Sequence, residues 1–260
     1  MQRKTLNPFV SFVFLLIFVS LACATTQPTP TSTSTPEPTA TNTAVPTETP
    51  RPSPTPRPTK TPNLAATQHA EDLNAEIQVY SEKGYLASTN GSFKELPDFN
   101  EAWAQLGWYS WWQLNYTVKD FYMKAHFKWS SAYRSADISG CGFVFAEQEN
   151  GDHYAVFLDR AKVYFVDTGY YVEPFGPTRG TGLVSFDNPA DHPVEADFTL
   201  IVKDAYAYVL VDEELVGEYT LSQSKVLRGG LGLSLLSGTN KDYGTRCEMT
   251  NLHIWIPDEN

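Results

Sequence analysis

The chain has 260 residues, of which 42% are hydrophobic and 13% aromatic, and its formal net charge is −11. Five of the 19 basic residues and two of the 30 acidic residues precede residue 63, which leaves about −14 on the rest of the chain. So acidic a domain is not expected to bind nucleic acid or an anionic lipid surface.

The first 22 residues have the pattern of a secretory signal peptide. Arg3 and Lys4 precede an apolar run over residues 9–19, and small residues lead up to Cys23. This run is too short for a comfortable membrane span. The segment resembles a bacterial lipoprotein signal, in which the cysteine is lipidated and becomes the mature N-terminus. An ordinary signal peptide and an uncleaved anchor are the alternatives, and in each case we expect export.

Residues 23–62 are predicted to be a disordered linker that begins with the lipidated Cys23. The segment is rich in Thr and Pro and has few apolar side chains, so it cannot bury enough surface to offset its ordering entropy. We therefore expect a tether that holds a folded domain at the cell surface. The lipid anchor would be its only attachment to the outer face of a bacterial membrane.

A short N-terminal helix is predicted over residues 63–84. Leu73, Ile77 and Tyr80 follow helical spacing, and Gly84 can end the helix. Because this apolar stripe is thin, the helix either packs lightly on the domain or continues the tether.

Residues 85–260 are predicted to form an all-β domain. Its strongest local signal is Asn150-Gly151, which lies between two alternating apolar runs and is typical of a two-residue hairpin turn. This turn would pair Phe145 with Val156. The side chains then expected to face the core are Cys141, Phe143, Phe145, Tyr154, Val156 and Leu158.

A second hairpin is predicted from residues 108–118 and 121–129. Alternation gives each strand one apolar and one polar face. Aromatic rings beside polar side chains are typical of sugar-binding faces, because rings stack on pyranoses while polar groups bind hydroxyls. For each ring, the alternative is packing beneath the helix or a loop. The ligand-binding residues expected on this face are Trp111, Gln113, Tyr122 and His126.

Further short strands follow along the chain, separated by turn residues, which indicates an antiparallel sandwich or barrel. A long loop rich in Gly and Pro is expected over residues 169–193. The remaining strands are predicted at residues 162–167, 196–203, 206–211, 215–220, 231–236 and 246–256.

Four segments resemble strands of the concanavalin A-like lectin/glucanase superfamily, laminin-G-like modules included. They read GFVFAEQENGDHYAVFLD, YAYVLVDEELVGEYT, GGLGLSLLSG and CEMTNLHIW. The resemblance covers about residues 85–258 and implies a two-sheet antiparallel jelly-roll sandwich. It departs at Asp212-Glu213, where many members carry Asn-Gly, so that hairpin is less firmly predicted.

This superfamily includes enzymes, lectins and protein-binding modules, so the resemblance alone does not imply one activity. Its retaining glucanases carry two glutamates about 5 Å apart on one strand. Glu195 and Asp197 begin such a pattern, but no second glutamate follows, so we expect no catalysis. Asp187 and Asp191 could bind Ca²⁺, as in some members, although a solvated acidic loop is the alternative. No other metal or cofactor is expected.

Cys141 and Cys247 are predicted to form a disulfide. Export favours disulfides, and these two thiols remain once Cys23 is lipidated. In a jelly roll the last strand returns among the early ones, which can bring the pair within reach. Two buried free thiols are the alternative.

The sequence thus predicts an exported, membrane-tethered, non-catalytic module that binds carbohydrate at the cell surface. A structural or protein-interaction module, which would bind a surface protein and no sugar, is the alternative hypothesis. A glycoside hydrolase with unrecognised catalytic residues is the third.

Overall fold

The computed structural model describes residues 64–134, 136, 138–169, 171–186 and 192–258. The predicted signal, Cys23, the linker and the two Ca²⁺ candidates Asp187 and Asp191 lie outside these residues. Within them, no helix is both long and apolar enough to cross a membrane. The elements in chain order are α1 (Leu64–Glu82), β1 (Gly91–Glu95), β2 (Phe99–Trp103), β3 (Trp108–Val118), β4 (Phe121–Ser131), β5 (Gly140–Glu147), β6 (His153–Leu158), β7 (Val163–Thr168), β8 (Val172–Phe175), β9 (Arg179–Gly180), β10 (Val194–Lys203), β11 (Tyr206–Val211), β12 (Glu214–Thr220), β13 (Gly229–Ser237) and β14 (Thr245–Pro257).

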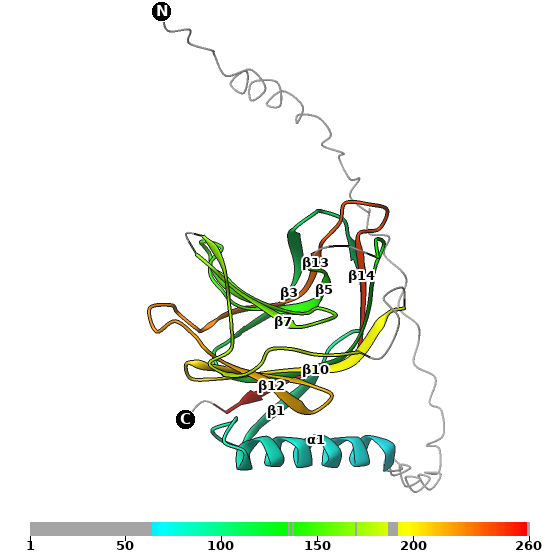
Figure 1. Cartoon of the computed structure of the whole chain (residues 1–260). Coiled ribbons are helices and arrows are strands. Elements are labelled where there is room, and N and C mark those ends of the chain that lie inside the picture. Colours follow the sequence, from blue (N-terminus) through cyan, green and yellow to red (C-terminus); the bar gives the residue numbers. More distant parts are fainter. Residues whose placement is uncertain (1–63, 135, 137, 170, 187–191, 259–260) are drawn as a thin grey trace, which may run out of the picture. The chain divides into compact units, whose positions relative to one another are not determined.

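The strands form two antiparallel sheets packed face to face, and the predicted jelly-roll sandwich is confirmed. The eight-stranded sheet has the order β1-β14-β4-β10-β11-β12-β9, with β2 also paired to β14. The six-stranded sheet has the order β3-β13-β5-β6-β7-β8. Figure 1 shows α1 on the outer side of the eight-stranded sheet, near β1 and β12.

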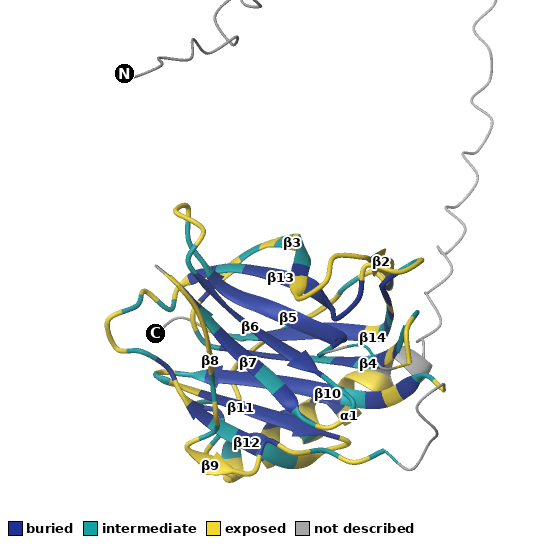
Figure 2. Cartoon of the chain, turned by 45° about the horizontal axis from the view of Figure 1, so that its top comes forward, coloured by how far each residue is buried: buried dark blue, intermediate teal, exposed yellow. Residues whose placement is uncertain are grey.

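Aromatic rings fill the space between the sheets, and Figure 2 shows the strands around it as buried. Phe127 of β4 stacks on Phe198 of β10 with ring centroids 4.9 Å apart. It also contacts Phe143 of β5 across the sandwich, at 5.2 Å. The predicted disulfide is present in the same layer, where Cys141 of β5 and Cys247 of β14 have Cα atoms 5.7 Å apart. This bond joins the two sheets covalently.

Helix α1 packs on the outer face of the eight-stranded sheet, which decides between the two alternatives for the predicted helix. Ile77 and Tyr80 are buried in one cluster with Tyr122 of β4, which is fully buried. The ring centroids of the two tyrosines are 5.7 Å apart. At the edge of this contact, Lys124 Nζ donates a hydrogen bond to Glu76 Oε1 at 2.9 Å.

The central hairpin, β5–β6, has the predicted core face but not the predicted register. Phe145 pairs with Tyr154 rather than with Val156. The Gly151 N–H donates to the Gln148 carbonyl at 2.9 Å, and Gly151 has a φ of 88°. A turn followed by a left-handed glycine makes a three-residue loop, one residue longer than the predicted turn. The pairing is shifted by two residues in total, and a bulge at Ala146 in β5 accounts for the second.

The second predicted hairpin is wrong, because β3 and β4 belong to different sheets. β3 pairs with β13, whereas β4 pairs with β10 and β14. The predicted core faces are correct, since Trp112 on β3 and Phe121 on β4 both pack in the core. Alternation assigns faces within each strand, but it does not say whether a short turn closes a hairpin or crosses to the opposite sheet.

The β11–β12 hairpin forms although its turn lacks glycine and asparagine. Asp212 and Glu213 have φ values of 50° and 68°, the positive values of a type I′ turn. The Asp197 N–H donates to Asp212 Oδ1 at 2.8 Å, and the Asp212 N–H donates to the Asp197 carbonyl at 2.9 Å. These bonds to β10 support the strained turn. The predicted irregular loop carries the short strands β8 and β9, and β1 and β2 were not predicted.

Candidate functional site

Two of the four predicted ligand residues lie together on the outer face of the six-stranded sheet. Trp111 and Gln113 project from β3, and both bond to Glu147 at the end of β5. Trp111 Nε1 donates to Glu147 Oε1 at 3.0 Å. Gln113 Nε2 lies 3.0 Å from both oxygens of the same carboxylate. These three residues are called the Trp111–Gln113–Glu147 cluster below.

A β-bulge turns Glu147 toward the outer face. Simple alternation places Glu147 on the core side with Phe145. Ala146, however, has a φ of 55°, and its side chain packs in the core. The register between β13 and β5 shifts at the same place, between Gly230 and Gly232. Bulges re-aim side chains in this way and are common beside functional sites.

Two glycines of β13 make room for the cluster, because β13 lies between β3 and β5. A Cβ at Gly232 would lie 3.2 Å from Trp111 Cδ1, and one at Gly230 would lie 3.2 Å from Glu147 Oε2. The indole and the carboxylate therefore reach each other over a strand that lacks side chains at both positions. Larger residues there would displace the cluster.

A buried Tyr–His pair supports Trp111 from the other side. His153 Nδ1 lies 2.7 Å from the Gly151 carbonyl, which can only accept, so Nδ1 carries the proton. His153 Nε2 then accepts from the Tyr109 hydroxyl at 2.6 Å. Burial lowers the pKa of His153 and raises that of Tyr109, which favours this neutral pair. The His153 ring lies 4.8 Å from that of Trp111, so the indole is held between two groups.

Hollows lie on both sides of Trp111 along β3. Toward the start of the strand, a hollow of about 260 Å³ is lined by apolar and aromatic groups, including Trp108, Tyr109 and Leu236. Trp108 is 49% exposed. Toward the end of the strand, a hollow of about 490 Å³ is lined by polar groups that include Gln113 and Glu147. The face thus changes from apolar to polar across Trp111.

The other two predicted ligand residues, Tyr122 and His126, lie on the eight-stranded sheet, because β4 is not paired with β3. The predicted grouping of all four residues is therefore wrong. Tyr122 is fully buried beneath α1, with its hydroxyl 3.2 Å from His253 Nε2. His126 Nδ1 lies 2.8 Å from Asp197 Oδ1 on the neighbouring strand β10. Only Trp111 and Gln113 remain on one face.

The charged side chains around His126 form cross-strand pairs. Lys128 Nζ lies 2.7 Å from Glu195 Oε1. This hydrogen bond raises the pKa of Lys128 and lowers that of Glu195. The two carboxylates that began the glucanase-like pattern, Glu195 and Asp197, thus each face a basic side chain on β4.

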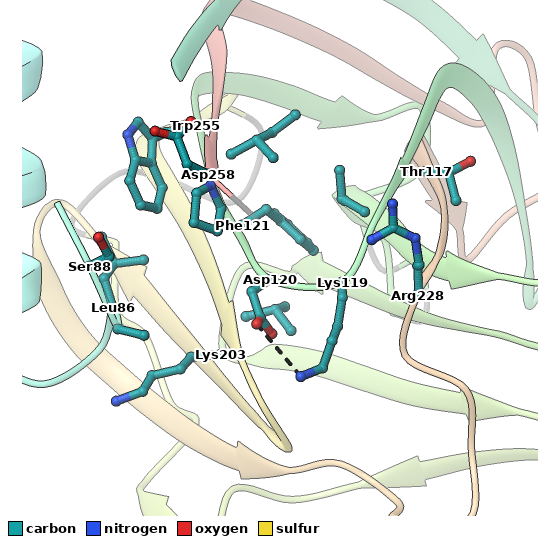
Figure 3. A pocket seen from close by; sticks show the side chains of 15 residues that line it. Leu86, Ser88, Thr117, Lys119, Asp120, Phe121, Lys203, Arg228, Trp255 and Asp258 are labelled. Carbon is teal, nitrogen blue, oxygen red and sulfur yellow. Dashed lines mark ion pairs between the residues drawn. The ribbon is translucent and has the colours of Figure 1, made fainter. Parts of the chain in front are cut away.

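A further hollow of about 310 Å³ lies where the β3–β4 connection, the end of β10 and the end of β14 come together (Figure 3). Lys119 Nζ lies 3.6 Å from Asp120 Oδ2 and 3.4 Å from Asp204 Oδ1. Lys203 Nζ donates to the Gly84 carbonyl at 2.9 Å. These lysines already have partners within the protein, which makes this hollow a weaker candidate than the cluster. Among all the residues that the structure describes, no group of three or more His, Cys, Asp or Glu could hold a metal ion.

No family model and no curated protein sequence matches the chain. Among solved structures, it is similar to the carbohydrate-binding module CBM66 from Bacillus subtilis, with 11% identity and a TM-score of 0.40 over 62% of this chain and 92% of that one. It is also similar to a fructosyltransferase from A. japonicus, with 15% identity and a TM-score of 0.45 over 68% of this chain but only 28% of the enzyme. A Bacillus licheniformis beta-glucanase matches with 11% identity and a TM-score of 0.38, over 55% of this chain and 69% of that one. These similarities do not bear on the ligand or on catalysis.

Proposed function

We propose that the protein is an exported, lipid-anchored, non-catalytic module that binds carbohydrate at the cell surface. The ligand face would be the outer face of the six-stranded sheet. The observation that carries this proposal is the Trp111–Gln113–Glu147 cluster, in which an indole ring is fixed beside a carboxylate and an amide.

This arrangement suits the two-sided chemistry of a sugar. A pyranose has apolar C–H faces that stack on aromatic rings and hydroxyl edges that need hydrogen-bond partners. Trp111 supplies the ring, and Glu147 retains lone pairs beyond those used by Trp111 and Gln113. Because the ring is already oriented by Glu147 and His153, binding would cost little conformational entropy.

The two hollows give the ligand room on either side of the ring. The apolar hollow beside Trp108 suits a second stacked ring or an apolar substituent, and the polar hollow beside Glu147 suits hydroxyl or amine groups. Together they favour an oligosaccharide over a single sugar.

A glycan array probed with the full chain in detergent tests this function. The unmodified protein is expected to bind a restricted set of glycans, and Trp111→Ala is expected to lose those signals. Lys128→Ala, on the outer face of the other sheet, serves as the matched control and should bind normally. If the protein binds no glycan on the array but captures a defined surface protein, the interaction-module alternative is favoured instead.

Separate measurements address the anchor and the absence of catalysis. If Cys23 is lipidated, Cys23→Ala is expected to release the protein from the membrane fraction; a variant that stays membrane-bound with an unchanged N-terminus contradicts the tether. If the module is non-catalytic, no reducing sugar should appear when it is incubated with the polysaccharide it binds.

A further inference from the structure

Among the described residues, the donors that hold the Glu147 carboxylate are all neutral. Its partners are the Trp111 indole N–H and the Gln113 amide, each at 3.0 Å. No lysine, arginine or histidine among the described residues forms an ion pair with it, whereas other carboxylates such as Asp167, Glu195 and Glu76 have such partners. Within the described part of the chain, its negative charge is therefore stabilised by neutral hydrogen-bond donors and by no paired basic side chain.

The nearby lysine is held elsewhere. Lys225, on the loop before β13, bonds to the Asp167 carboxylate and to the Thr168 carbonyl, and it also lies over the Tyr154 ring. Because the Lys225 ammonium group already has these three partners, pairing with Glu147 would require it to break existing interactions.

The carboxylate is open to the polar hollow because Gly230 stands beside it. Glu147 Oε2 would be 3.2 Å from a Cβ at that position, so any side chain there would crowd this oxygen. The hollow of about 490 Å³ is also lined by Gln113, Tyr116 and Glu149. The lining of the hollow thus includes two acidic residues, an amide side chain and a tyrosine.

We infer that this hollow binds a protonated primary amine, so that the ligand is a glycan containing amino sugars with free amines. The inference rests on the proposed carbohydrate-binding function and narrows it. An ammonium group has three donors, and a carboxylate without a cation is the acceptor that forms its strongest hydrogen bonds. The excess of acidic residues in the domain adds a long-range attraction for cations and disfavours acidic glycans.

Three hexasaccharides with the same linkage separate the amine from the rest of the sugar. They are the β-linked oligomers of glucosamine, N-acetylglucosamine and glucose, each titrated calorimetrically into the full chain in a mildly acidic buffer. The glucosamine oligomer is expected to bind at least about tenfold more tightly than the other two, since a charge-assisted hydrogen bond is about twice as strong as a neutral one. This preference should shrink as salt is added.

Glu147→Gln keeps the size of the side chain and an oxygen for Trp111 and Gln113 but removes the charge. It is expected to abolish the preference for the glucosamine oligomer. Glu101→Gln, an exposed position on β2 of the other sheet, removes the same charge and should leave the preference unchanged. A urea unfolding curve of each variant verifies that it is folded.

Each outcome has one meaning. Equal binding of the three oligomers, or binding of the N-acetylated or neutral one alone, overturns the inference and leaves the carbohydrate-binding function standing. A glucosamine preference that survives Glu147→Gln, or falls equally with Glu101→Gln, also overturns it, since the attraction would then be a general effect of net charge. If no glycan binds, here or on the array, the proposed function and the inference both fail.

Discussion

Reduction of the Cys141–Cys247 disulfide is expected to destabilise the domain by about 5 kcal/mol. The two cysteines are 106 residues apart in sequence, so the bond closes a long loop in the unfolded chain. On the chain-entropy model, a loop of about 100 residues corresponds to about 4.7 kcal/mol at 25 °C, and the cost rises only slowly with length. Both residues are fully buried in the core, where thiols pack as small apolar groups, so the native state should change little.

Urea unfolding followed by tryptophan fluorescence, with and without reductant, measures this difference. With a slope of about 2–3 kcal/mol per molar urea, the midpoint should fall by roughly 2 M. The slope itself should rise, because the unfolded chain without the crosslink exposes more surface. Mass analysis after alkylation should show two additional reactive thiols in the reduced sample.

The matched control is the double variant Cys141→Ala/Cys247→Ala, whose unfolding should not respond to reductant. If reduction lowers the free energy of unfolding by less than about 1 kcal/mol while both thiols are shown to be free, the crosslink does not constrain the unfolded chain as argued. If both thiols react before reductant is added, the bond is not formed in the protein.

Three further predictions concern the two outer faces. Gly232→Val should displace Trp111 and lower glycan affinity at least tenfold, measured by calorimetry, because its Cβ would lie 3.2 Å from the indole. Burial lowers the pKa of His153 and of His253 in the folded state. Below about pH 6.5 these two histidines therefore bind protons more readily in the unfolded chain, which favours unfolding. The urea midpoint should accordingly fall as the pH drops from 7.5 to 5.5. Ile77→Ala, on the buried side of α1, should cost about 2–4 kcal/mol in the same urea assay.

Each of these has its own control or contradicting outcome. Gly176→Val lies where an added Cβ meets nothing, so it should leave glycan affinity unchanged. The pH effect is decided by its own outcome, because a midpoint that stays constant down to pH 5.5 would contradict the argument from buried histidines. Gln78→Ala, on the exposed side of α1, should be nearly neutral; an equal loss in both helix variants would mean that α1 is not docked through Ile77.

Most strands were predictable because each carries a local signal. Period-two alternation located β3 to its exact ends and assigned the core faces of β5 and β6. Strands β1 and β2 were not predicted, because they are short and mostly exposed and therefore show no such alternation. The disulfide was predicted from the expected export, the number of cysteines and the return of the last strand in a jelly roll.

The arrangement of strands was less predictable, because it depends on contacts far apart in sequence. The Lys119-Asp120 segment looks like a hairpin turn, yet it crosses between sheets, and this crossing separates Trp111 and Gln113 from Tyr122 and His126. Tyr122 is further hidden by α1, whose thin apolar stripe gave no sign of where it docks.

Glu147 was missed because its orientation depends on a bulge. Alternation places its charge in the core, and such a contradiction is itself a signal that the strand is irregular at that point. The Gly230-Leu231-Gly232 stretch was noticed only as part of a fold resemblance. Its physical meaning, a strand without side chains beneath Trp111 and Glu147, becomes visible only with the neighbouring strands in place.

The indole N–H resonances of the six tryptophans provide the most direct test of the proposed ligand face. Each can be assigned by single substitution and followed as a glycan selected from the array is added. The Trp111 signal, from an N–H bonded to Glu147, should shift most, and the exposed Trp108 should shift with it. Trp255, buried on the opposite sheet beneath α1, should stay in place. A glycan that shifts Trp255 and leaves Trp111 unchanged would place binding elsewhere and contradict the account.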